Sequence, residues 1–333
     1  MSNPHVSQWR EDILGPDFMN CEINFGPDPE GEGEAIASLV RYLPEGEPTP
    51  KDWASRRAIL WVPGMTDYFF HAHLAHDLHE AGYAFYALDL RKCGRARVGN
   101  QRWHYSNDFR HYFPDLNAAL DILSTEHSGV VPLAHSTGGL ITALWADHLA
   151  TNDSARHDQL DGIILNSPWL DMMYPRPLVV MGKPIVNLAG KLFPRLAIPG
   201  GNLGSYGSSL HISRHGTWEF DTVMKPLGGH PKYLGWLREV LRNQAKVHRN
   251  KIDVRVPVLT LCSAHSLLGK PYSAAADSAD IVLDIEQIKR WAPQLGQEVT
   301  VRSIQGARHD VFLSTPYPLE EAMMITSNWL SRL

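Results

Sequence analysis

Residues 130–139 read Val130-Val131-Pro132-Leu133-Ala134-His135-Ser136-Thr137-Gly138-Gly139. A short apolar run precedes one serine, and residues with the apolar spacing of a helix follow it. Small residues two before and two after the serine, Ala134 and Gly138, allow the close backbone contacts of a sharp strand-to-helix turn. Such a turn, a nucleophile elbow, lifts the Ser136 hydroxyl out of the sheet. It also points the N–H of Thr137 at the group that the serine attacks.

A second stretch, Leu203-Gly204-Ser205-Tyr206-Gly207, nearly matches the same pattern. It lies in a run rich in glycine and serine with no strand before it, whereas Ser136 follows a β-branched run. On the motif alone, Ser136 could also be a serine that caps a helix. The context favours Ser136 as the nucleophile.

The composition is typical of a globular protein that acts on a small molecule. The chain has 333 residues, 44% hydrophobic and 20% charged, and a net charge of -5. A single enlarged domain is as plausible as two. The negative balance argues against nucleic acid or an anionic membrane as partner, because the overall field would attract neither. Cys21, Cys93 and Cys262 are odd in number and far apart, so we expect buried free thiols.

The first residues and the apolar runs bear on localisation. Residues 1–5 lack the basic and apolar regions of a signal peptide, and no run approaches the length that spans a bilayer. We therefore expect a cytoplasmic protein without a stable membrane anchor. A homodimer is left open.

Short β-rich runs alternate with helical patterns along most of the chain, which predicts a mostly parallel sheet flanked by helices, an α/β fold. The eight expected strands are 21–25, 35–42, 58–62, 84–88, 130–134, 162–166, 258–262 and 299–304. The expected helices are 70–81, 109–124, 137–150, 285–295 and 319–333.

One segment interrupts this alternation. From about residue 168 to residue 251 Pro, Gly and Trp are irregularly spaced, no strand is convincing, and only 230–247 has a helical pattern. Roughly 80 residues exceed any ordinary connecting loop, so we expect a subdomain over one end of the sheet. The predicted division is a core of residues 1–167 and 252–333 with a lid of residues 168–251.

A serine hydroxyl becomes a good nucleophile only when a base takes its proton. His309 is the best candidate among the 17 histidines, because it lies on a loop between the last expected strand and the last helix. That loop is at the carboxyl edge of the sheet, where catalytic groups gather in open α/β sheets.

The other histidines have structural interpretations. His71, His73, His76 and His79 are spread around a helix, which is more typical of a solvated face than of a metal site. His135 is expected to point away from Ser136 into the packing of the elbow.

A third group must hold the imidazole in the correct tautomer. In the order serine, acid, histidine, the acid follows strand 258–262, and the candidates are Asp277, Asp280 and Asp284. We choose Asp280, because residues 279–283 have the form of an acid-bearing turn that leads into a helix. A surface charge or an N-cap is the alternative for each of them.

Two N–H donors must also stabilise the negative charge on the carbonyl oxygen. Thr137 supplies one, and Met65, in the loop after strand 58–62, is the expected source of the second. Gly64 would let that backbone come near the substrate.

With these parts in this order, the chain resembles the α/β-hydrolase superfamily, and within it the monoacylglycerol lipase and lysophospholipase group, also called the serine aminopeptidase type. The likeness is strongest over about residues 55–170. Residues 60–65 match the oxyanion loop, residues 83–95 match the strand and "D-x-R-G-x-G-x-S" turn, and residues 134–139 match the elbow. Residues 258–261 and 306–310 extend the match, while the lid is similar only in position and size.

Three departures from the family pattern concern the oxyanion loop, the elbow and the turn after Asp89, and the first two keep the geometry. Pro63 stands where the family usually has His, and Ala134 where the elbow usually has Gly. Lys92-Cys93 replaces the usual Gly-His in the turn after Asp89.

The fourth departure concerns the acid. The family has "G-x-x-D" soon after the strand that here ends at Cys262, whereas this chain has Ser263-Ala264-His265-Ser266. Either a lengthened loop brings Asp280 back to His309, or the acid comes from another strand end, for which Asp171 is the candidate.

Together, the residues and the resemblance predict a serine hydrolase of carboxylic esters. Ser136 would form an acyl-enzyme, His309 would act as general base and acid, and Asp280 would orient it. No metal or organic cofactor is expected. The alternatives are amide, peptide or thioester cleavage, acyl transfer, or a ligand-binding homologue without turnover.

The expected partner is a small ester with an apolar acyl or aryl group. Aromatic residues in or next to the lid would line its pocket, or would pack as lid core instead. They are Trp169, Tyr174, Trp218, Phe220, Tyr233 and Trp236. Trp169, Tyr174 and Trp218, with Gly64, are the expected substrate contacts.

Overall fold

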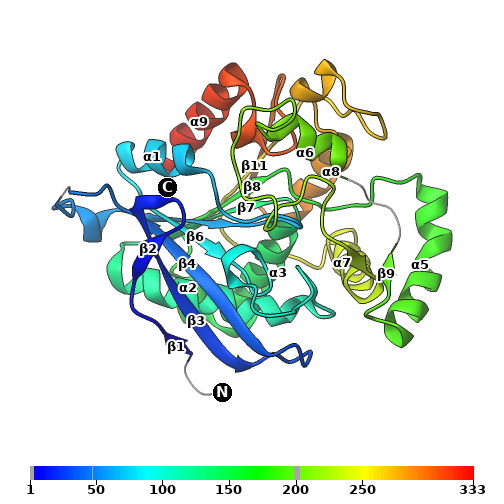
Figure 1. Ribbon diagram of the computed structural model, residues 1–333, viewed down its shortest axis with the longest axis horizontal. Coiled ribbons are helices and arrows are strands. Elements are labelled where there is room, and N and C mark those ends of the chain that lie inside the picture. The colour runs from blue at the N-terminus through cyan, green and yellow to red at the C-terminus, as the bar shows by residue number, and fades with distance from the viewer. Residues whose placement is uncertain (1–3, 47, 199–202) are drawn as a thin grey trace.

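A ten-stranded sheet forms the centre of the molecule (Figure 1). The computed structural model describes residues 4–46, 48–198 and 203–333. The neighbours run β1-β3-β4-β6-β5-β7-β8-β11-β12, with β2 paired to β3. The strands are β1 (His5–Val6), β2 (Arg10–Asp12), β3 (Gly15–Pro27), β4 (Glu34–Tyr42), β5 (Ala58–Val62), β6 (Ala84–Asp89), β7 (Val130–His135), β8 (Ile163–Asn166), β11 (Val258–Ser263) and β12 (Val299–Ile304).

Helices cover both faces of this sheet. They are α1 (Ala72–Glu80), α2 (Phe113–Glu126), α3 (Thr137–Asn152), α4 (Ser154–His157), α5 (Arg176–Leu192), α6 (Gly204–Leu210), α7 (Leu234–Val247), α8 (Ile285–Trp291) and α9 (Pro316–Leu330). Figure 1 shows α1 and α9 on one side of the sheet and α2 and α3 on the other. The predicted α/β architecture is confirmed.

Alternation along the central strands builds two separate cores. In β5, Ile59 and Trp61 pack with α1 and α9, whereas Ala58, Leu60 and Val62 pack with α2 and α3. This period of two is what a strand covered on both faces by helices requires. From β6 to β12 the pairing is parallel, so the carboxyl ends of these strands meet at one edge.

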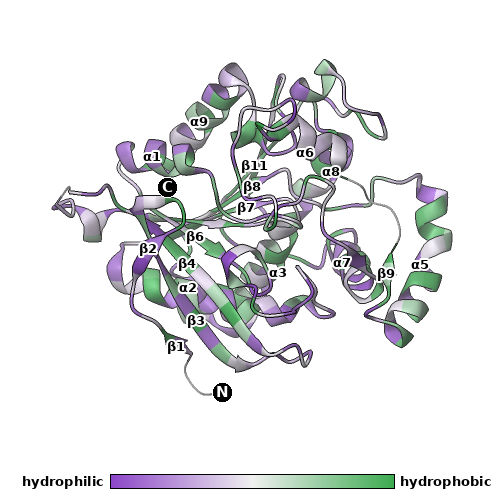
Figure 2. Cartoon of the chain, in the orientation of Figure 1, coloured by the Kyte–Doolittle hydropathy of each residue, from purple (hydrophilic) through white to green (hydrophobic). Residues whose placement is uncertain are grey.

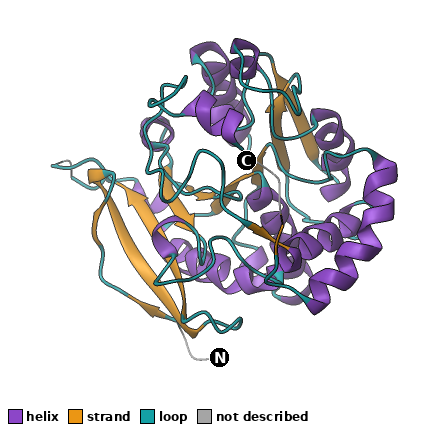
Figure 3. Cartoon of the chain, turned by 45° about the vertical axis from the view of Figure 1, so that its right-hand side comes forward, coloured by secondary structure: helices purple, strands orange, loops and turns teal. Residues whose placement is uncertain are grey.

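The first part of the chain adds an antiparallel extension. Strands β1 to β4 pair antiparallel, and β4 joins the parallel part through β6. Figure 3 shows these N-terminal strands at one end of the molecule. We did not expect β1 and β2, because they are two and three residues long and mostly exposed, so they carry no apolar alternation.

The inserted segment contains α5, α6 and α7 and the two-residue strands β9 (Ala197–Ile198) and β10 (Lys232–Tyr233). The prediction that it holds a single helix was wrong. Helix α5 carries Gly182, Pro184 and Gly190 in its interior, and these residues of low helix propensity argued against a helix although its apolar residues have helical spacing. Gly190 is where α5 meets α7, because a Cβ there would lie 2.6 Å from the carbonyl oxygen of Leu234. Among the described residues, no helix is long and apolar enough to cross a membrane.

Candidate active site

Ser136 occupies a strained turn between β7 and α3. Its φ is 52° and its ψ is -116°, a region that costs a residue with a Cβ on the order of 1–3 kcal/mol. The Ser136 N–H donates to the carbonyl oxygen of Asn166 at 2.9 Å, which anchors the turn to β8. A Cβ at Gly138 would lie 2.3 Å from the carbonyl oxygen of Pro63, so this position requires glycine.

Gly64 lies against the elbow. A Cβ there would lie 3.0 Å from the Cβ of Ser136 and 3.2 Å from Nδ1 of His135. The absence of a side chain therefore lets the loop after β5 pack against the elbow. This contact with Ser136 and His135 requires glycine. Gly64 is not among the residues that line the cavity containing Ser136 and His309.

The structure brings Ser136, His309 and Asp280 into one row of hydrogen bonds. The Ser136 hydroxyl lies 3.1 Å from Nε2 of His309, and Oδ2 of Asp280 lies 2.8 Å from Nδ1 of the same ring. The other oxygen of Asp280 accepts the N–H groups of Val282 and Leu283, both at 2.8 Å. Because Asp280 is fully buried and fully hydrogen-bonded, the orientation of the imidazole is fixed.

A lengthened loop places Asp280 where the family pattern predicts an acid. The Asp280 N–H donates to the carbonyl oxygen of His265, and the Leu267 N–H donates to that of Asp280, both at 2.8 Å. Asp280 therefore lies beside Ser266, and residues 267–279 form the excursion between them.

The other candidate acids have different partners. Asp277 accepts from Arg308 at 2.8 Å, Asp284 caps α8 by accepting the N–H of Glu286 at 3.0 Å, and Asp171 accepts from Trp291 at 2.9 Å. Of these four carboxylates, Asp280 is the one that bonds the ring of His309.

The two expected oxyanion donors belong to α3 and to the loop after β5. Thr137 is the first residue of α3, so its N–H has no partner within the helix. Met65 belongs to the loop after β5, and its N–H donates to no described residue. Both residues line the cavity that contains Ser136 and His309.

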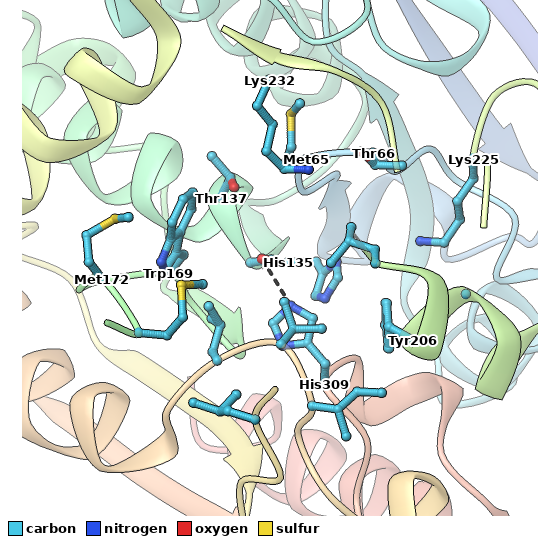
Figure 4. A pocket seen from close by; sticks show the side chains of 18 of the residues that line it. Met65, Thr66, His135, Thr137, Trp169, Met172, Tyr206, Lys225, Lys232 and His309 are labelled. Carbon is cyan, nitrogen blue, oxygen red and sulfur yellow. Dashed lines mark hydrogen bonds between the residues drawn. The ribbon is translucent and has the colours of Figure 1, made fainter. Parts of the chain in front are cut away.

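That cavity has a volume of about 410 Å³ and is mostly apolar. Trp169, Tyr174, Phe220 and Trp236 line it, as expected, together with Met172 and Met173. Figure 4 shows Trp169 and Met172 on one side of the His309 ring and Lys225 and Tyr206 on the other.

Two of the six aromatic residues expected in the pocket do not line the cavity, and for Trp218 this corrects the prediction. Its indole N–H donates to the carbonyl oxygen of Leu313 at 2.8 Å, and its ring stacks on His73 at 4.4 Å. These contacts turn the side chain toward α1. Tyr233 is absent from the cavity wall as well and packs edge-on against Tyr105.

The histidines near α1 also require a correction. His71 is fully buried and bonds Asp310 at 2.8 Å, and His79 is 6% exposed. His73 is half-buried beside Trp218, and burial, together with the charge of His71, lowers its pKa to about 4. Only His76 of these four is exposed, so they do not form a solvated face.

Buried charges surround the base of the site. Asp310, next to His309, accepts from His71 at 2.8 Å and from the amide of Asn166 at 2.6 Å. Burial by itself would raise the pKa of the Asp310 carboxyl, but the imidazoles of His135 and His71 outweigh it and hold that pKa well below its usual range.

A second buried carboxylate, Asp67, lies between Lys225 and His135. Its oxygens are 2.5 Å from the ammonium of Lys225 and 2.9 Å from Nδ1 of His135. Burial would raise the pKa of Asp67, but the charge of Lys225 and the hydrogen bond from His135 hold it well below its usual range. His135 does pack within the elbow, yet its ring also faces His309, with centroids 4.9 Å apart.

A metal ion would compete with existing contacts in this region. Ligand atoms of Asp67, His135 and Asp310 lie within 4.8 Å of one another. Lys225 already supplies a cation to Asp67, and His71 already bonds Asp310. The donor set is therefore satisfied by the chain's own residues.

Sequence reasoning missed Asp67, Asp310 and Lys225. Asp310 follows His309 directly and Asp67 lies in the loop after β5, so both were adjacent to predicted site residues. No pattern around Lys225 could have found it, because its partner is 158 positions away in the chain.

Comparison with known protein families gives one match that covers most of the chain. The model of a family described as serine aminopeptidase, S33 matches residues 54–315. None of the curated proteins matches the chain in sequence.

Several solved structures are similar in fold. A soluble variant of monoglyceride lipase from Saccharomyces cerevisiae, in complex with a substrate analog, is 18% identical, with a TM-score of 0.64 over 100% of this chain and 97% of that one. Monoacylglycerol lipase from Paleococcus ferrophilus is 19% identical, with a TM-score of 0.60 over 84% and 96%. A carboxyl esterase from Bacillus coagulans is 15% identical, with a TM-score of 0.62 over 95% and 99%. At these identities the likeness shows a shared fold.

Proposed function

Since the chain belongs to the serine aminopeptidase S33 family of α/β-hydrolases, we propose that it is a serine hydrolase that cleaves small carboxylic esters. The observation that carries this proposal is the row of hydrogen bonds from Ser136 through His309 to Asp280 at the base of an apolar cavity. The cavity wall, rich in methionine and tryptophan, suits an apolar acyl or aryl group.

The first half of the reaction forms an acyl-enzyme. Nε2 of His309 takes the proton of the Ser136 hydroxyl as its oxygen attacks the ester carbonyl. The N–H groups of Met65 and Thr137 hold the oxyanion, and the strained elbow keeps Thr137 in place before the substrate arrives. His309 then gives its proton to the leaving alcohol.

The second half reverses the roles. A water molecule gives a proton to His309 and attacks the acyl-enzyme, and the same imidazole returns a proton to Ser136 as the acid leaves. Asp280 keeps Nδ1 protonated throughout and stabilises the imidazolium, because its carboxylate is buried and 2.8 Å from that nitrogen.

Residues 168–251 would act as a lid in this scheme. Trp169, Met172, Lys225 and Trp236 of this segment line the cavity, so the insertion shapes the acyl pocket.

The three cysteines are buried and free, which supports the cytoplasm as the compartment.

A fluorophosphonate probe tests the nucleophile, with adducts located by mass spectrometry of the full chain. We expect one adduct on Ser136 and none in Ser136→Ala. The variant Ser205→Ala, at the near-match of the motif, should react like the unaltered protein.

A panel of p-nitrophenyl esters and p-nitroanilides tests whether the enzyme cleaves ester or amide bonds. Absence of an adduct on Ser136 would refute the proposal. An adduct without ester turnover would favour amide cleavage, if the anilides react, or a ligand-binding homologue, if neither reacts.

A further inference from the structure

The loop after β5, residues 63–68, is held in place by a distant part of the chain. Residues 66, 67 and 68 each make a hydrogen bond to the segment 221–230 of the insertion, which we call the clamp segment. Its partners are 153 to 164 positions away in the chain. The contacts are the His230 N–H with Oγ1 of Thr66 at 3.0 Å, the Lys225 ammonium with Asp67 at 2.5 Å, and the Asp221 N–H with the Tyr68 hydroxyl at 2.7 Å.

The backbone of this loop needs such support. Thr66 has a φ of 59°, in the left-handed region that a β-branched residue rarely adopts. It directly follows Met65, whose N–H is the proposed second oxyanion donor. A strained conformation persists only where its surroundings fix it, and here the clamp segment supplies part of those surroundings.

Lys225 makes the strongest of these contacts. The residue is only 5% exposed, and its ammonium lies 5.4 Å above the ring of Phe70 and 5.8 Å above that of Phe220. Asp67 binds Lys225 with one oxygen and His135 of the elbow with the other. A single carboxylate therefore connects the insertion, the loop after β5 and the elbow.

We propose that the clamp segment positions the oxyanion hole, and that Lys225 is a positioning residue that sets the Met65 N–H through Asp67. This inference rests on the proposed ester hydrolysis. The insertion would then have two roles: it shapes the acyl pocket, and it holds the loop that carries an oxyanion donor. Opening of the lid would have to leave residues 221–230 in place.

The effect should fall on the transition state, because the oxyanion forms only after attack. Removal of one oxyanion donor typically costs 10²–10³ in kcat, so a displaced donor should cost about 10- to 100-fold. We expect Lys225→Met to lower kcat by that factor with KM changed less than about threefold. Lys225→Arg should recover part of the loss, because it keeps the charge. Thr66→Val and Tyr68→Phe, which remove single neutral hydrogen bonds, should lose less.

The experiment compares these variants with Ser205→Ala, which removes a hydrogen bond from the insertion to the carbonyl oxygen of Lys270, away from the loop after β5. Rates on p-nitrophenyl butyrate are divided by the number of sites that a fluorophosphonate titrates, so that loss of folded protein does not count. A trifluoromethyl ketone, whose adduct places an oxyanion in the hole, should bind Lys225→Met more weakly in proportion to the fall in kcat/KM.

Hydrogen exchange of residues 63–68 gives a readout that needs no turnover. We expect faster exchange in Lys225→Met and no change in Ser205→Ala. An unchanged kcat per titrated site together with unchanged exchange would overturn the inference. A rise in KM alone would also overturn it, since Lys225 would then bind substrate directly. If the unaltered protein formed no adduct and turned over no ester, the proposed function would fail, and the exchange comparison would still decide whether Lys225 holds the loop.

Discussion

The clamp segment and helix α5 belong to the same insertion. The clamp segment buries polar side chains, whereas α5 leaves apolar side chains exposed. Lys225 and His230 of the clamp segment are buried, although one is charged and the other polar. Within α5, all of which the structure describes, only Gly190 is buried. Five apolar side chains on that helix are more than half exposed: Leu178, Met181, Ile185, Leu188 and Leu192. Figure 2 shows hydrophobic stretches along α5.

This difference teaches that hydropathy alone does not tell which part of an insertion supports the core. A buried charge stabilises a structure only through its partners, and Lys225 has Asp67. An exposed leucine contributes little, because its apolar surface stays in water. The polar, buried contacts should therefore carry the large effects, and the apolar face of α5 the small ones.

The largest effect is expected for the acid of the proposed triad. Asp280→Asn should lower kcat by about 10⁴, because an amide at this place favours the wrong tautomer of His309. Steady-state kinetics on a p-nitrophenyl ester measures it. Asp171→Asn and Asp277→Asn are matched controls, since both carboxylates have other partners. Full activity in Asp280→Asn with loss in Asp171→Asn would assign the acid to Asp171.

Asp310→Asn should give the largest loss of stability. It removes the charge that His71 and Asn166 surround and leaves a donor unpaired inside the protein, at about 3–5 kcal/mol. Urea unfolding measures the loss. Asp284→Asn is the control, because an asparagine caps a helix about as well as an aspartate. Equal stability of the two variants would mean that the buried network contributes no more than a surface cap.

Acid should destabilise the protein through its neutral histidines. The pKa values of His73 and His230 are lowered to about 4, mainly by burial. A folded-state pKa below the unfolded value of about 6.5 gives stability that is complete above pH 6.5 and is lost as pH falls toward 4. For His73 the loss should be on the order of 2 kcal/mol.

His73→Gln should flatten this pH dependence, because Gln keeps a donor for the carbonyl oxygen of Phe312 but cannot titrate. The urea midpoint measured between pH 4 and pH 7 tests the change. His76→Gln is the control, since His76 is exposed. A pH profile identical to that of the unaltered protein would show that His73 is not the group responsible.

The smallest effect is expected on the open face of α5. Ile185→Gln should change stability by less than about 0.5 kcal/mol, because Ile185 is 69% exposed. Gly190→Val in the same helix should cost about 1–3 kcal/mol, because its side chain would clash with Leu234. Thermal unfolding compares them. A large loss in Ile185→Gln would mean that this face packs against something in solution.

Much of the core could be predicted because its signals are local. All eight expected strands form, since β-branched and apolar runs of suitable length suffice to mark a buried strand. Ser136 could be proposed because it lies directly after β7 in a motif that a few neighbouring residues fix, and His309 because it lies on the loop between β12 and α9. Helix α5 was missed despite its helical apolar spacing, because Pro184 and two glycines have low helix propensity.

The site beyond these two residues depended on contacts between distant segments. Asp280 was one of three candidates after β11, and its place was decided by the backbone hydrogen bonds to His265 and Leu267. Trp218 had the composition of a pocket residue, yet the carbonyl oxygen of Leu313 turned it away.

By itself, the sequence determined the α/β core and the position of the elbow, because strand alternation and a strained turn depend on residues that are neighbours in the chain. Only the tertiary structure decided which carboxylate faces His309, which aromatic rings line the cavity, and that Lys225 reaches Asp67. The physical reason is that burial and charge pairing depend on how segments that are distant in the chain are arranged in three dimensions. Whether a lysine is a solvated side chain or part of a buried pair depends on what folds against it.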